Sequence, residues 1–96
     1  MAAFISFQPR DFFKTLQFTG TGASNTQTYP ETTDMQSDFI WFKNEDDGSG
    51  PASAGTNHML TDANQGVQKY MESNETTVST SNVNSLTAFN SDGFTV

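Results

Sequence analysis

Phenylalanine dominates the apolar content of this sequence and limits what it can fold into. Leu, Ile, Val and Phe together number 18 of 96 residues, and nine of the 18 are Phe. Each buried phenyl ring removes roughly 150 to 250 Å² from water, so a few rings build a small core that the scarce aliphatic side chains cannot. Cysteine is absent, so neither a disulfide nor a thiolate metal site reinforces the fold. We therefore expect a folded domain of marginal stability.

The length of the chain points to a need for a partner. Ninety-six residues make one domain at most, and a chain this short buries only about 60 to 65% of the surface that its unfolded form exposes. Association with another subunit is the remaining source of stability. We predict docking onto other proteins or homo-oligomerisation, for example as a trimer.

Charge and hydropathy exclude two classes of partner. The formal net charge is −7, and the four cationic residues are Arg10, Lys14, Lys43 and Lys69. Four cations are too few to neutralise a phosphate backbone. The apolar runs are short, and no basic segment followed by an apolar stretch opens the sequence, so we predict no signal peptide and no transmembrane helix. Neither nucleic acid nor a membrane is an expected partner.

The polar composition favours β-structure. Thr, Ser and Asn supply 32 of the 96 residues, and these residues suit β-edges and turns better than helices. We predict an all-β fold over residues 15–96, an antiparallel β-sandwich of the jelly-roll or lectin-like kind. Residues 15–19 alternate apolar and polar side chains, which predicts a half-buried strand. Residues 38–43 hold four consecutive large apolar side chains, which predict a central strand covered on both faces, with the core beside it.

The C-terminal third contains one ambiguous element and one clear one. Residues 67–73 fit a helix or a strand. Residues 86–96 predict a β-hairpin, because alternating residues flank the turn Asn90-Ser91-Asp92-Gly93, in which Asp92-Gly93 supplies the positive φ angles. The sequence stops within the second strand pattern. We therefore expect either that another chain completes the sheet or that the strand has been cut short.

Residues 1–14 read as an extended N-terminal arm that is rich in aromatic side chains, with a helical turn possible after Pro9. So dense an aromatic set in a terminal segment is costly to leave in water, and terminal segments stay ordered only when they are docked. One interpretation is an anchor for a neighbouring subunit, and the other is a first strand that packs on its own domain. The candidate partner-binding residues are Phe4, Phe7, Pro9, Phe12 and Phe13.

No residue pattern points to catalysis, a cofactor or a metal. His58 is the sole histidine, and without a nucleophile-elbow pattern it is best explained as a surface or hydrogen-bonded structural residue. Gly20-Thr21-Gly22 lacks the third glycine and the following helix of a phosphate loop, so it predicts a turn. The acidic segment 44–57 lacks the ligand spacing of an EF-hand, which favours a solvated loop over a calcium site. Asp34 and Asp38 fit a turn entering a strand better than a paired acid on a helix.

Several segments in combination resemble a domain that recurs in virion and tail proteins of marine tailed phages, often near the N-terminus of tail-fibre-like chains. The resemblance covers nearly the whole sequence and is carried by Phe7-Gln8-Pro9 with Asp11-Phe12-Phe13, by residues 16–22, by Ser37 to Asn44, by His58 with Leu60 and Asp62, and by Ser85-Leu86 with Phe89 to Phe94. It implies a lectin-like β-sandwich with a virion role and brings no catalytic residues with it.

Two positions depart from the pattern of that domain. Gln65-Gly66 stands where such domains usually carry Arg-Gly, and the tryptophan-containing strand expected after Gly93-Phe94 is absent. The second departure favours either truncation or strand donation by a neighbour.

The sequence thus predicts a non-enzymatic virion protein. The leading hypothesis is the N-terminal attachment module of a tail fibre or related tail protein, docked onto other virion subunits and located on the tail rather than the capsid shell. The alternatives are a capsid decoration protein and a lectin-like module that binds host surface glycans. The glycan hypothesis requires an exposed aromatic ring beside the acidic loop, from Trp41, Tyr29 or Tyr70.

Overall fold

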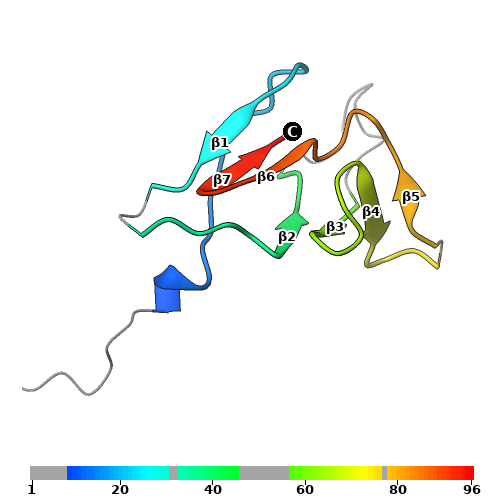
Figure 1. Ribbon diagram of the computed structural model, residues 1–96. Coiled ribbons are helices and arrows are strands. Elements are labelled where there is room, and N and C mark those ends of the chain that lie inside the picture. Colours follow the sequence, from blue (N-terminus) through cyan, green and yellow to red (C-terminus); the bar gives the residue numbers. More distant parts are fainter. Residues whose placement is uncertain (1–8, 31–32, 46–56, 77) are drawn as a thin grey trace, which may run out of the picture.

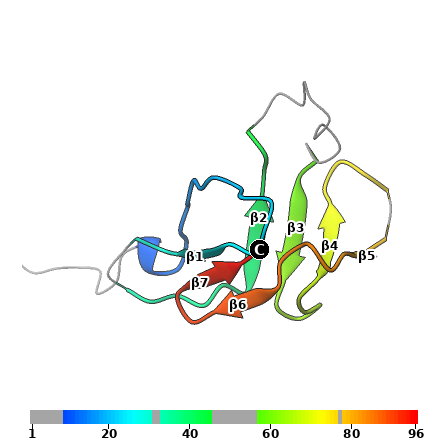
Figure 2. The ribbon, with the colours of Figure 1, turned by 90° about the horizontal axis from the view of Figure 1, so that it is seen from above.

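The computed structural model describes residues 9–30, 33–45, 57–76 and 78–96, and nearly all of its regular structure is β. In chain order the elements are η1 (Pro9–Asp11), β1 (Thr26–Thr28), β2 (Phe39–Phe42), β3 (Met59–Asp62), β4 (Lys69–Glu72), β5 (Thr80–Ser81), β6 (Ala88–Asn90) and β7 (Gly93–Thr95). The strands form two antiparallel sheets, with orders β1-β7-β6 and β2-β3-β4-β5 (Figures 1 and 2). The predicted all-β antiparallel class is confirmed. Within the described ranges, no helix is long and apolar enough to cross a membrane.

The three-stranded sheet is built around the predicted C-terminal hairpin. β6 and β7 pair with Asn90 opposite Gly93, so that Ser91 and Asp92 form the turn. The hairpin and its turn at Asn90 to Gly93 are confirmed, but the predicted positive φ at Asp92 is wrong. Gly93 has φ of +155°, whereas Gln68 is the one non-glycine residue with positive φ in the part of the chain that the structure describes. Asp92 therefore does not supply a positive φ angle.

Gly93 also lets β1 approach β7. The backbone of Thr28 lies opposite Gly93, and a Cβ atom built at Gly93 would lie 1.9 Å from the carbonyl oxygen of Gln27. No side chain fits in that space. Strand β1 can therefore pair with β7 in this register only because residue 93 is glycine.

The four-stranded sheet contradicts the prediction for residues 38–43. β2 is a strand, as predicted, but it lies at the edge of its sheet, and Phe39 and Trp41 are 55% and 59% exposed. Only the alternate residues Ile40 and Phe42 turn inward and pack against the core. Large apolar side chains thus occupy both faces of β2, although only one face is covered.

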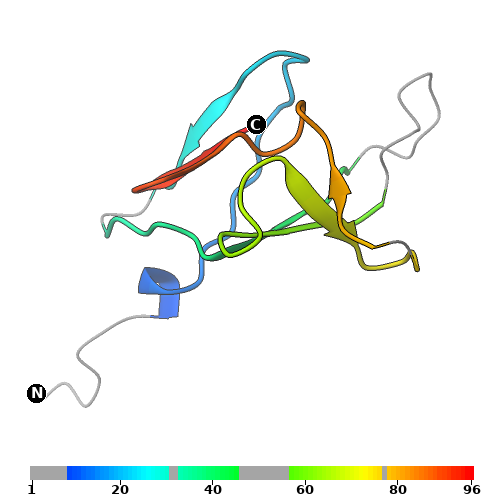
Figure 3. The same cartoon turned by 45° about the vertical axis from the view of Figure 1, so that its right-hand side comes forward.

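The core lies between the hairpin and β2. Its buried apolar residues are Tyr29, Leu86 and Phe94. The ring of Phe94 makes edge contacts with Phe42 and Phe18, with ring centroids 5.2 and 5.5 Å away. Such aromatic pairs contribute about 0.5 to 1.5 kcal/mol each beyond the burial of their area. Phenylalanine therefore supplies the contacts that join the two sheets, which lie as separate layers in Figure 3.

Three further segments resolve or correct the predictions. Residues 15–19 are not a strand, although their burial alternates as predicted and Leu16 and Phe18 pack on the core. Residues 67–73 contain the strand β4, not a helix. Residues 33–38 lead into β2 without a helix, which agrees with the predicted turn around Asp34 and Asp38.

Candidate interaction surfaces

Two adjacent phenylalanines form the first candidate surface, which we call the aromatic end. The 3-10 turn η1 precedes them, and the amides of Phe12 and Phe13 both donate hydrogen bonds to the carbonyl oxygen of Pro9, at 3.0 and 2.9 Å. Pro9 suits the first position of the turn because its φ is already fixed. The side chains of Phe12 and Phe13 are 69% and 75% exposed. The local backbone is thus ordered while both rings face solvent.

Lys14 connects the aromatic end to the domain. Its ammonium group donates a hydrogen bond to the carbonyl oxygen of Thr33 and lies 5.7 Å from the centre of the Tyr29 ring, close enough for a cation–π contact. η1 itself projects from the sheets at one end of the molecule (Figures 1 and 3). Of the five predicted partner-binding residues, Pro9, Phe12 and Phe13 are exposed together here, whereas Phe4 and Phe7 lie outside the described residues.

The second candidate surface is the outer face of the four-stranded sheet. Phe39 and Trp41 point outward from β2, and Leu60 and Met71 are aligned with Trp41 across β3 and β4. Residues directly opposite in antiparallel strands share a face, so these four side chains form one apolar stripe. Phe39, Trp41 and Met71 are exposed, and Leu60 is half-buried.

Trp41 is held in place by the sole histidine. Its indole nitrogen donates a hydrogen bond of 2.9 Å to Nδ1 of His58, and the two rings meet edge to face with centroids 5.5 Å apart. A neutral imidazole that accepts at Nδ1 carries its proton on Nε2. His58 is therefore a hydrogen-bonded structural residue, as predicted. The Trp41 ring is exposed, as the glycan hypothesis requires, whereas Tyr29 is buried; whether the ring lies beside the acidic loop stays a prediction, because residues 46–56 lie outside the described residues.

A cleft of about 480 Å³ is the third candidate site. Six of its eight lining residues have polar side chains, and they come from the inner face of β4, from the residue two positions before β3, and from the segment between β5 and β6. They are Asn57, Tyr70, Glu72, Asn82, Asn84 and Ser85. The sequence patterns gave no sign of this cleft, because its residues come from segments that only the tertiary structure brings together.

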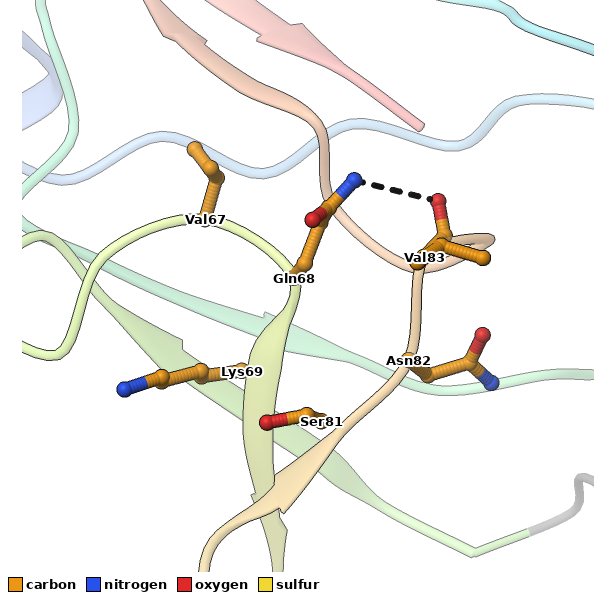
Figure 4. A pocket seen from close by; sticks show the side chains of 6 residues that line it. All are labelled: Val67, Gln68, Lys69, Ser81, Asn82 and Val83. Atoms are coloured by element: carbon orange, nitrogen blue, oxygen red, sulfur yellow. Dashed lines mark hydrogen bonds between the residues drawn. The ribbon is translucent and has the colours of Figure 1, made fainter.

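A shallower pocket of about 150 Å³ lies beside it, where Gln68 faces Val83 (Figure 4). The amide of Gln68 donates a hydrogen bond of 3.4 Å to the carbonyl oxygen of Val83. Asn82 lines both this pocket and the cleft. Because Val67, Lys69, Ser81 and Val83 are all exposed, this pocket is a surface depression rather than an enclosed site.

The acidic residues do not gather at any of these surfaces. Among residues 9–30, 33–45, 57–76 and 78–96, no three His, Asp or Glu side chains come together in a way that would hold a metal ion. Residues 46–56, which make up most of the predicted acidic loop, lie outside the described residues. The choice between a solvated loop and a calcium site for residues 44–57 therefore stays a prediction.

The fold and its surfaces define a small antiparallel two-sheet domain that presents aromatic side chains to solvent. By sequence the chain belongs to the DUF7483 family, described as a domain of unknown function, whose model matches residues 8–96. No curated protein and no solved structure matches the chain. The family assignment thus covers both sheets and η1 and names no activity.

Proposed function

We propose that this chain is a non-enzymatic attachment module of a tailed-phage virion, belonging to a tail fibre or a related tail protein and docking onto other virion subunits. The exposure of the adjacent rings of Phe12 and Phe13 carries the proposal. Two neighbouring phenyl groups on an ordered turn are costly to leave in water, and aromatic side chains of this kind are enriched at the centres of protein interfaces. The virion setting comes from the sequence resemblance alone.

The position of the aromatic end suits such a role. η1 projects from the sheets, so another subunit can cover Phe12 and Phe13 without disturbing the Phe94 core. We propose that the docking residues also include Phe4, Phe7 and Pro9. Lys14 fixes the direction in which the segment leaves the domain, through its contacts with Thr33 and Tyr29. An oriented anchor loses less conformational entropy on binding than a free one.

The test compares phage particles that carry the unchanged chain with particles that carry the double variant Phe12→Ala and Phe13→Ala. We expect the amount of this chain in purified virions, measured by mass spectrometry, to fall at least about tenfold, because central aromatic contacts contribute 2 kcal/mol or more to binding. The matched control is Val78→Ala with Val83→Ala, since both valines are exposed and lie far along the chain from η1. The control should assemble normally.

Circular dichroism of the isolated variants separates anchoring from folding. If Phe12 and Phe13 only anchor, the spectrum of the double variant should match that of the unchanged chain. Collapse of the spectrum would show that the arm is part of the fold, and virions that keep the full amount of variant chain would refute docking through this end. Recovery of the chain from the shell alone would favour the decoration-protein alternative.

The glycan-binding hypothesis remains a second candidate because Trp41 is 59% exposed and its indole N–H is fixed by His58. A ring held in one orientation offers a flat apolar surface to a sugar at little entropic cost. Loss of binding to host cells in Trp41→Ala particles that assemble normally would support this role.

A further inference from the structure

The cleft on the inner face of the four-stranded sheet has a composition that neither the docking role nor the exposed Trp41 ring explains. Strand residues that face the interior of a two-sheet domain are normally apolar, yet β4 turns Tyr70 and Glu72 toward the cleft. Both side chains are half-buried, and Met59 and Val96 are the apolar residues in the lining. The Glu72 carboxylate loses part of its hydration on this face, which costs free energy. A bound ligand that donates a hydrogen bond to the carboxylate would offset that cost.

Hydrogen bonds within the protein orient the amides around the cleft. The side-chain oxygen of Asn57 accepts from the amide of Asn74 at 2.8 Å. The side-chain oxygen of Asn82 accepts from the backbone N–H of Asn84 at 2.8 Å. Because both side-chain oxygens already accept hydrogen bonds within the protein, the NH₂ groups of Asn57 and Asn82 are the donors available to a ligand. Ser85 fixes the same segment, because its hydroxyl donates to the carbonyl oxygen of Asn82 at 2.7 Å.

The charges of the lining restrict the class of ligand. The cleft is lined by no Lys, Arg or His among the described residues, and Glu72 places a negative charge in it. An anionic ligand such as a nucleotide or a phosphorylated compound would meet repulsion without a counter-charge. A purely apolar ligand would leave the carboxylate and the amides unpaired. The ligand that fits is neutral and rich in hydroxyl groups.

A peptide strand is a poor fit for the same site. β4 lies between β3 and β5, so both of its edges are already paired. The backbone of the opposite wall is also occupied, because Asn82 donates to Gln68 and Ser85 donates to Asn82. Strand addition depends on unpaired backbone groups at a sheet edge. Recognition in this cleft must therefore come from side chains.

We propose that the cleft lined by Tyr70, Glu72, Asn57 and Asn82 binds a neutral saccharide. The Tyr70 ring stacks on the apolar face of a pyranose, the Glu72 carboxylate accepts from its hydroxyl groups, and the two amides donate to its oxygens. A volume of about 480 Å³ lies in the range of about 300 to 1,000 Å³ that is usual for small-molecule sites. This site is separate from the aromatic end and from Trp41 on the outer face, and it does not depend on the proposed docking role.

The test is a titration of the full ¹⁵N-labelled chain with neutral sugars, followed by two-dimensional NMR. The probes are methyl α-mannoside, lactose, maltotriose and triacetylchitotriose, with glucuronic acid as the anionic comparison. We expect saturable shifts of the side-chain NH₂ signals of Asn57 and Asn82 with at least one neutral sugar. Glucuronic acid should bind at least about tenfold more weakly because of Glu72.

Variants locate the site. Glu72→Gln keeps the shape of the side chain, and Tyr70→Ala removes the ring, so each should weaken binding of the neutral sugar about tenfold. Trp41→Ala on the outer face and the Phe12→Ala, Phe13→Ala double variant should bind as the unchanged chain does. If Tyr70→Ala fails to fold, Glu72→Gln decides the question alone.

Three results would overturn the proposal. One is the absence of saturable shifts with every neutral sugar. Another is sugar binding that is lost in Trp41→Ala but kept in Glu72→Gln, which would place the site on the outer face. The third is equal affinity for glucuronic acid, which would contradict the role of Glu72. None of these results bears on whether Phe12 and Phe13 anchor the chain.

Discussion

Gly93 shows how one residue serves two parts of this fold. It follows the turn of the C-terminal hairpin, and its missing side chain leaves room for the carbonyl oxygen of Gln27 in the neighbouring strand. A larger residue would push β1 away from β7, and with it Tyr29, which follows β1 and contributes to the core. The hairpin and the core therefore depend on the same position.

Gly93→Ala should destabilise the domain by about 3 kcal/mol, since overpacking against backbone typically costs 1 to 3 kcal/mol and strain at a positive φ adds to it. The measurement is the free energy of unfolding in urea. Gly20→Ala is the matched control, because a Cβ atom there meets nothing within 4 Å, and it should change stability by less than about 0.5 kcal/mol. Equal effects of the two substitutions would mean that β1 does not pack on β7 as described.

The sequence predicted this hairpin but not the reason for its glycine. An Asp-Gly pair between alternating residues is a local signal, and it located the turn correctly, although only Gly93 and not Asp92 has a positive φ. The contact between Gly93 and Gln27 joins residues that are far apart in the chain, and no local pattern reports it. The same holds for the cleft, where Asn57, Tyr70 and Asn82 meet only after the sheets have formed.

Strand β2 illustrates what a run of consecutive apolar residues can and cannot predict. Its position was predicted correctly, but its four consecutive large side chains were interpreted as a strand covered on both faces. Periodicity cannot distinguish that arrangement from an edge strand with one exposed apolar face. The difference matters for function, because the exposed stripe of Phe39 and Trp41 is a candidate interaction surface, while Ile40 and Phe42 hold the strand to the core.

Alanine substitutions on the two faces of β2 should lower the stability of the domain by unequal amounts. Ile40→Ala should lower the free energy of unfolding by about 2 kcal/mol, at the low end of the range for Ile in a core because Ile40 is only half-buried. Phe39→Ala should cost less than about 1 kcal/mol, because more than half of its surface is already in water. Thermal or urea unfolding followed by circular dichroism provides the comparison. A larger loss for Phe39→Ala would place the core on the other side of the sheet.

The core and the cleft lie in different parts of the two-sheet arrangement. The Phe94 cluster joins the three-stranded sheet to β2. By contrast, β4 borders both the cleft and the surface pocket, and β5 borders the surface pocket. β5 has two residues, both exposed, and pairs with β4 alone. The far edge of the four-stranded sheet is therefore secured mainly by backbone hydrogen bonds and few apolar contacts.

Hydrogen exchange should reveal this difference. We expect the backbone amides of Thr80 and Ser81 to exchange at least about 100-fold faster than that of Phe94 in the central strand β7, because edge strands with little apolar packing open locally at low free energy. A saturating neutral sugar should slow exchange at β4 and β5 if it binds in the cleft. Uniform protection across both sheets would indicate that the domain opens only as a unit.

The placement of Leu86 and Phe94 determines when the chain can fold during synthesis. Both core residues lie far C-terminal to their partners Phe18, Tyr29 and Phe42, so they are synthesised well after them. A nascent chain that has reached only β5 contains Phe18 and Phe42, whose ring centroids lie 6.5 Å apart, but it lacks Phe94, the ring that both of them pack against. Contacts between residues so distant in sequence form slowly and leave apolar surface open in the meantime. The growing polypeptide is therefore open to aggregation and to chaperone binding until the β6–β7 hairpin has emerged.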